Sequence, residues 1–277
     1  MQAGRIHRAV SADGTGIAGR VVGEGPPIVL LPAGPGDSET CWRHVVPFLS
    51  ERFTCYLMDT RGRGLSAGHP DHAPERLVGD VMAFSESIRR PVGLVGAGDG
   101  LWAMVAAEGP GAVAAVAVYE PGADEVMSAS IATRLAGAFA RVEELVAHQR
   151  LDAAARAFIE ASDAIYGEEE LASGVPAAFW KAAAPYLPVF LREMGLLAEA
   201  EEPSPTAPSV LGRIKVPLLL LYGTQTNPWF KRSVHHIAGH VATSRIEALE
   251  GAAHFGLITH PQALADALIR FFSDRLG

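Results

Sequence analysis

The stretch VGLVGAGDGLWAMVAA, residues 92–107, decides the fold of this chain and raises the first question about its chemistry. Its apolar opening predicts a buried strand, and its helix-forming close predicts a helix. Between them GAGDG, residues 96–100, predicts a sharp turn, the setting in which a G-x-S-x-G motif raises a nucleophilic serine above a sheet. The central position is Gly98, which has no side chain, so an acyl-serine cannot form there.

The rest of the chain alternates short apolar runs with amphipathic stretches, the pattern of a parallel sheet covered by helices. Strands are expected at residues 27–32, 54–58, 92–95, 114–119, 216–222 and 244–249. Helices are expected at residues 41–51, 74–89, 101–108, 230–239 and 261–275. The predicted fold class is therefore α/β, with a mostly parallel sheet flanked by helices.

Residues 122–212 interrupt this alternation. They are rich in Ala, Leu, Glu and Arg and hold no strand-like run, so we expect them to be helical. An all-helical insertion before the penultimate strand predicts a cap over the C-terminal edge of the sheet, where ligands bind in open α/β folds. We expect a core domain of residues 1–121 and 213–277 and a helical cap of residues 122–212.

Composition restricts the partners of the chain. The formal net charge of −8 gives no basic surface, so nucleic acid is not an expected partner. The two cysteines, Cys41 and Cys55, suit a reducing compartment. The chain start lacks the apolar core of a signal peptide, and no apolar run approaches the roughly 20 residues that span a bilayer. We expect a cytoplasmic protein without a membrane partner, and the oligomeric state is left open.

Four short motifs stand in order along the chain: LPAGPGD at residues 31–37, DTRGRGLS at 59–66, GAGDG at 96–100 and GAAH at 251–254. In this order they resemble the oxyanion loop, the D-x-R-G-x-G-x-S turn, the nucleophile elbow and the late G-x-x-H of the α/β-hydrolase superfamily, over about residues 20–277. The resemblance implies an α/β-hydrolase fold with a helical cap insertion. It also implies that His254 is the catalytic histidine.

The chain departs from the family pattern at the other catalytic positions. Gly98 stands where the nucleophile is expected, and Thr226 stands where the acid is expected. Pro32 and Ala33 replace the His-Gly pair of the oxyanion loop. Of the triad positions only His254 is kept, so a covalent esterase mechanism lacks both its nucleophile and its usual orienting charge.

His254 is the leading candidate for a general base or acid, and the alternative is a structural histidine without a catalytic role. Its ring needs a partner that fixes the tautomer, for which Glu120 is the first candidate and Asn227 the second. Glu120 could instead serve only to bind nearby backbone amides. Asp99 is either a third acid or base or, as a helix cap, a structural residue. A shift of the motif by one residue would make Asp99 the nucleophile itself, although Leu101 would then stand where the turn needs a small residue.

The resemblance also implies an oxyanion site. Backbone N–H groups of Gly34 and Asp99 would polarise a substrate carbonyl, and Gly98 would leave room for a water or a substrate atom. Candidates for an apolar pocket wall are aromatic residues of the cap and of the late loops, together with residues of the oxyanion loop, although each is also an ordinary core or capping residue: Asp37, Trp42, Trp180, Tyr186, Phe190, Trp229 and Phe255. The sequence indicates no metal site and no cofactor.

These residues predict an enzyme of small-molecule metabolism, such as natural-product metabolism, that uses His254 without a covalent serine. Its reaction would be hydrolysis by activated water, cyclisation, elimination or isomerisation of a small apolar or aromatic organic substrate. Three alternatives are a non-catalytic small-molecule binder, a serine hydrolase whose nucleophile was replaced at Gly98, and an NAD(P)-binding protein. The last alternative reads Gly96, Gly98 and Gly100 as a dinucleotide turn, with Glu120 as the ribose ligand.

Overall fold

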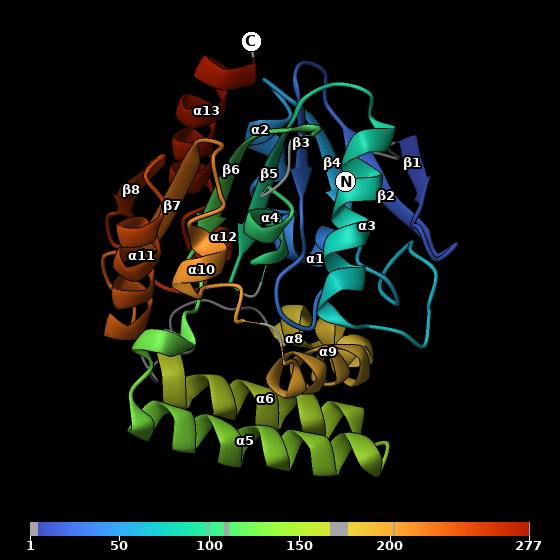
Figure 1. Cartoon of the computed structure of the whole chain (residues 1–277). Helices are drawn as coiled ribbons and strands as arrows, with labels where there is room; N and C mark the ends of the chain where they lie inside the picture. The colour runs from blue at the N-terminus through green and yellow to red at the C-terminus, as the bar shows by residue number, and fades with distance from the viewer. Residues whose placement is uncertain (1–4, 99, 108–110, 167–176, 202, 277) are drawn as a thin grey trace.

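A computed structural model describes residues 5–98, 100–107, 111–166, 177–201 and 203–276. Its centre is an eight-stranded sheet with the strand order β1-β2-β4-β3-β5-β6-β7-β8 (Figure 1). The strands are β1 (Arg5–Val10), β2 (Gly16–Val22), β3 (Pro27–Leu30), β4 (Thr54–Met58), β5 (Val92–Ala97), β6 (Val113–Tyr119), β7 (Leu218–Gly223) and β8 (Ser244–Leu249). The predicted α/β fold class is confirmed.

All six strands from β3 to β8 run parallel, and each coincides with a predicted strand to within a few residues. The central strands are short, nearly continuous apolar runs because both of their faces are covered. The sequence did not predict β1 and β2, which form an antiparallel hairpin at one edge. Most side chains of β1 are exposed, so this strand carries little of the apolar signal that marks the others.

Helices cover both faces of the sheet. The described helices are α1 (Ser38–Trp42), α2 (Val46–Leu49), α3 (Pro74–Ser87), α4 (Trp102–Val105), η1 (Asp124–Val126), α5 (Ala129–Ala147), α6 (Leu151–Tyr166), α8 (Ala177–Ala183), η2 (Ala184–Tyr186), α9 (Leu187–Glu199), α10 (Pro208–Leu211), α11 (Pro228–His240), α12 (Gly256–Thr259) and α13 (Pro261–Leu276). One face packs against α1, α2 and α13, and the other packs against α3, α4 and α11.

Two predicted helices differ from those observed. The helix expected at residues 41–51 is divided into α1 and α2, with Pro47 in the first turn of α2. Proline has no N–H to donate and fits only the first turn, so a continuous helix cannot pass through Pro47. The helix expected at residues 101–108 is shorter, ending as α4 at Val105.

Helices α5, α6, α8 and α9 lie between β6 and β7 in the chain, and we call these four helices the helical segment. Figure 1 shows α5 and α6 lying side by side beyond one end of the sheet, with α8 and α9 between them and the sheet. The segment has a small apolar core of its own around Val142, Ala154 and Leu187. Among the described residues, no helix is both long and apolar enough to cross a bilayer.

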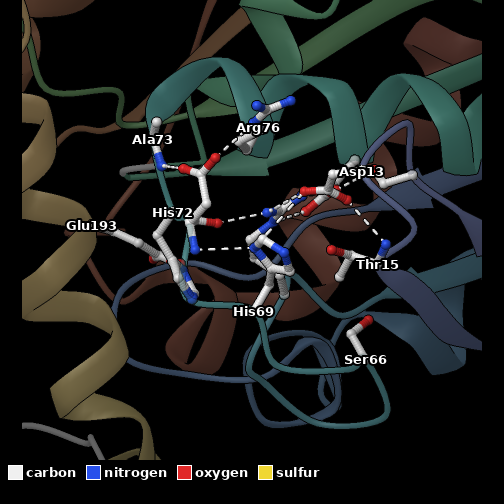
Figure 2. A network of polar contacts seen from close by, with 12 residues as sticks. Asp13, Thr15, Ser66, His69, His72, Ala73, Arg76 and Glu193 are labelled. Atoms are coloured by element: carbon white, nitrogen blue, oxygen red, sulfur yellow. Dashed lines mark hydrogen bonds and ion pairs between the residues drawn. The ribbon is translucent and has the colours of Figure 1, made fainter.

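A buried arginine connects the edge hairpin to the rest of the sheet. Arg61, in the turn after β4, is fully buried and binds Asp80 of α3 through two 2.7 Å hydrogen bonds. The same guanidinium binds Asp13 of the β1–β2 turn at 2.9 Å, within the polar network of Figure 2. A guanidinium held by two carboxylates is compensated for the loss of its water.

We expect Asp80→Ala to lower the free energy of unfolding by about 3–5 kcal/mol, because the Arg61 charge would be left buried with half of its partners removed. Urea denaturation followed by circular dichroism measures the change. Glu75→Gln, an exposed change on the same helix α3, is the matched control and should leave the stability within about 0.5 kcal/mol. Equal stabilities for the two variants would contradict this role for Arg61.

Candidate active site

Glu120 follows β6 and is fully buried. One carboxylate oxygen accepts the Gly223 N–H at 2.8 Å, and the other accepts the Thr226 hydroxyl at 2.8 Å. The backbone of Glu120 has a φ of 47°, a left-handed value that non-glycine residues adopt only when their surroundings hold them there. Thr226 thus stands in the expected acid position and bonds to a carboxylate that arrives from a neighbouring strand.

His254 lies against this carboxylate. Its Nδ1 is 2.9 Å from Glu120 Oε2, and its ring stacks on Phe230 with a centroid distance of 4.4 Å. Because a carboxylate oxygen accepts, the proton of the neutral ring belongs on Nδ1, which makes Nε2 the basic nitrogen. Asn227, the second candidate partner, accepts from the Trp229 N–H and caps α11. The pair that the structure brings together is His254 and Glu120.

Gly98 lies opposite the imidazole. Its φ is 53°, and a Cβ atom added there would be 3.8 Å from Cε1 and 4.0 Å from Nε2 of His254. The turn needs its flanking glycines for another reason, since a Cβ on Gly96 would be 2.2 Å from the carbonyl oxygen of Gly100. The turn therefore has the backbone geometry of a nucleophile elbow, with glycine at the position where a nucleophilic side chain is expected. Asp99 lies outside the described residues, so its proposed roles stay predictions.

The oxyanion loop follows β3 and contributes Gly34, whose φ is 52°, to the wall of the site. Arg63, from the DTRGRGLS turn, donates to the carbonyl oxygens of Gly34 and Gly36. The Ala33 N–H is 3.3 Å from Cys41 Sγ. Two carbonyl oxygens of the loop are thus bound by one guanidinium, so the shape of the loop depends on Arg63.

Arg63 is in turn bound by the helical segment. Glu193 of α9 pairs with Arg63 through one carboxylate oxygen, and its other oxygen is 3.2 Å from His72 Nδ1. All three side chains are buried, and Figure 2 shows Glu193 of the helical segment facing His72, which lies just before α3. We call Arg63, Glu193 and His72 the latch cluster. It joins the helical segment to the oxyanion loop through one guanidinium.

A cavity of about 530 Å³ lies between the sheet edge and the helical segment, and His254, Gly98 and Gly34 are in its wall. Four of the residues that the sequence predicts for a pocket wall line it: Trp180, Phe190, Trp229 and Phe255. Further aromatic residues line it without having been predicted: Trp102, Tyr119, Phe139, Phe158, Phe179 and Phe230. Within the described part of the chain, the cavity wall is largely aromatic and holds one histidine, His254.

Three predicted pocket residues are not in this wall. Trp42 is fully buried in the core, where its Nε1 donates to the Leu31 carbonyl at 2.7 Å. Asp37 caps α1 by accepting the Thr40 N–H at 2.7 Å. Tyr186 donates to Asp37 at 3.4 Å, and burial together with the Asp37 charge raises the pKa of its phenol. Asp37 is therefore a helix-capping residue, which was the structural alternative to its expected place in the pocket wall.

Comparison with known proteins places the fold. A model of the alpha/beta hydrolase family matches residues 28–267, and the chain belongs to this family. An alpha/beta hydrolase from Sphaerobacter thermophilus superposes with a TM-score of 0.77 at 23% identity, over 96% of this chain and 100% of that one. An esterase from Rhodococcus sp. gives 0.76 at 24% identity, over 98% and 99%.

An enol-lactonase from Burkholderia xenovorans superposes with a TM-score of 0.73 at 20% identity, over 96% of this chain and 100% of that one. Likenesses at these identities show the fold alone. The search of curated proteins gives no match. Within the described part of the chain, no group of three or more His, Cys, Asp or Glu side chains is arranged to hold a metal ion.

We expect Gly98→Ser to react covalently with a fluorophosphonate probe, because the new hydroxyl would lie beside His254 Nε2 and its partner Glu120 is already in place. Intact-mass spectrometry measures the adduct. The wild-type chain and the double variant Gly98→Ser/His254→Ala should remain unlabelled. Labelling of the double variant at the same rate would show that His254 does not activate a group at this position.

We expect Glu193→Gln to raise the hydrogen-exchange rate of the amides in residues 33–38 by about tenfold, as the loss of a charge-assisted hydrogen bond on Arg63 predicts. Exchange measured by mass spectrometry of peptides reports this. Glu199→Gln, an exposed change on the same helix, is the matched control. Faster exchange confined to α9 would mean that the latch cluster does not hold the oxyanion loop.

Proposed function

We propose that this protein is an enzyme that performs acid–base chemistry on a small apolar or aromatic organic molecule without forming a covalent serine intermediate. The observation that carries the proposal is the His254–Glu120 pair facing a glycine elbow, with Nε2 of His254 only 4.0 Å from where a side chain would begin. A buried carboxylate that orients a histidine toward a cavity is the arrangement of a general base.

Direct hydrolysis is the reaction that fits this arrangement most simply. A water above Gly98 gives a proton to His254 Nε2 while its oxygen bonds to the substrate carbonyl carbon, and the carbonyl electron pair moves to oxygen. Collapse of this intermediate expels the leaving group, which takes the proton back from His254. Glu120 stabilises the imidazolium between these two steps, as the carboxylate of a triad does.

The oxyanion would be stabilised from the loop after β3. Gly34 is in the cavity wall, and its backbone N–H is the donor that the resemblance assigns to this role. Arg63 fixes the neighbouring carbonyls, which keeps the loop in one conformation before substrate binds. Cyclisation, elimination and isomerisation need only the proton transfer by His254, so the same residues would serve those reactions.

The dinucleotide alternative fits the site less well. Glu120 is fully buried, and its carboxylate accepts from Gly223, Thr226 and His254, so it is not presented to a ribose. A non-catalytic binding protein would use the cavity but not the His254–Glu120 pair. The test below distinguishes it from an enzyme, because it would bind compounds without turning them over.

The test is turnover of a panel of aryl esters, aryl amides and lactones, followed by product analysis. We expect the wild-type chain to hydrolyse at least one class, and His254→Ala to lower kcat/KM by about 10²–10⁴-fold. Glu120→Gln should lower kcat with little change in KM, because Glu120 acts on the imidazole and does not touch the substrate.

A single turnover in oxygen-18 water then separates direct hydrolysis from a covalent route through a carboxylate. Direct attack labels the acid product in the first turnover and leaves the protein unlabelled. Label in the protein would instead place a carboxylate nucleophile in the site. Binding of panel compounds without any turnover would favour a binding protein and contradict the proposed function.

A further inference from the structure

The charge of the cavity wall restricts what the cavity binds. No lysine or arginine is among the described residues that line it, and apart from Cys41 and Tyr119 its ionisable side chains there are His254 and Asp124. Buried anions in proteins are paired with cations or with several hydrogen-bond donors. A ligand carboxylate or phosphate would find no lysine or arginine in the described wall, which favours neutral or cationic ligands over anions.

Asp124 stands in η1, directly after the chain leaves β6, and its side chain is open to solvent where the cavity wall begins. Its carboxylate has no hydrogen-bond or ion-pair partner among the described residues. Its neighbour Glu125 is engaged elsewhere, since it accepts from the Thr206 hydroxyl at 2.7 Å and lies 3.9 Å from His236. Asp124 is therefore the carboxylate that the cavity presents to a ligand.

A row of aromatic rings connects Asp124 to His254. The indole N–H of Trp229 donates to the carbonyl of Ala123, next to Asp124, at 3.0 Å. Trp229 packs on Phe230 at 4.8 Å between centroids, and Phe230 stacks on His254 at 4.4 Å. This row of stacked and tilted rings runs from the backbone beside Asp124 to the imidazole, and Trp229, Phe230 and His254 all line the cavity.

Aromatic rings beside a carboxylate are the chemistry that recognises an organic cation. The ring faces attract a positive charge, and the carboxylate pairs with it. We propose that the cavity selects a substrate with an aromatic body along Phe230 and Trp229 and a cationic amine held at Asp124. This inference rests on the proposed function only in calling the ligand a substrate, because the selectivity itself concerns binding.

Isothermal titration with three naphthalene probes of the same size tests it: 2-naphthylmethylammonium, 2-naphthylmethanol and 2-naphthoate. The wild-type chain should bind the ammonium about three- to tenfold more tightly than the alcohol and bind the carboxylate most weakly. Asp124→Asn should bring the ammonium and the alcohol to equal affinity. Glu125→Gln, whose carboxylate is already bonded, is the matched control and should keep the preference.

Raising the salt concentration should reduce the ammonium preference of the wild-type chain and leave the alcohol unaffected, since only the first depends on charge. Equal binding of ammonium and alcohol, an unchanged preference in Asp124→Asn, or no binding of any probe would overturn the inference. Ammonium selectivity without turnover of any substrate would leave this inference standing and remove the proposed function. Turnover of neutral substrates without ammonium selectivity would support the proposed function and overturn this inference.

Discussion

The hydrogen bond between His254 Nδ1 and Glu120 Oε2, 2.9 Å long, is the contact on which the chemistry of the site depends. It sets the tautomer of the ring and directs Nε2 toward Gly98. Glu120 itself has a left-handed φ of 47°, and its carboxylate is also held by bonds from Gly223 and Thr226. The usual acid position is thus occupied by a supporting residue.

The glycine elbow and this pair together define a site in which a sharp backbone turn faces an oriented histidine and carries glycine at its central position. The positive φ of Gly98 and the close approach of Gly96 to Gly100 are what a sharp turn between strand and helix requires. Gly98 itself has no side chain that could attack a substrate. His254 and a largely aromatic cavity wall lie around this turn, and they are the groups on which the proposed proton transfer rests.

The sequence predicted most of the parallel sheet because β3 to β7 are short, nearly unbroken apolar runs, a signal that burial on both faces produces. It did not predict β1, whose side chains are mostly exposed. Motif order was sufficient to bring His254, Glu120 and Gly98 to one place. Motif order could not predict the direction in which a side chain points. Trp42 points into the core, whereas Phe230, which nothing in the sequence distinguished, stacks on the imidazole of His254.

Long-range polar contacts were equally hidden. Arg63 and Glu193 are 130 residues apart in the sequence, and no local pattern marks them as partners. Only the packing of the helical segment on the sheet brings them together. The same holds for Asp124, because the absence of competing partners around a carboxylate depends on the tertiary structure.

The most direct test of the central claim is a crystal structure of the chain with a bound substrate analogue from the panel. The account predicts that the reactive carbon of the ligand lies above Gly98, with a water or a transferable proton within hydrogen-bond reach of His254 Nε2, and with the ring still bound to Glu120. A ligand bound elsewhere in the cavity, with His254 turned away from Gly98, would contradict it.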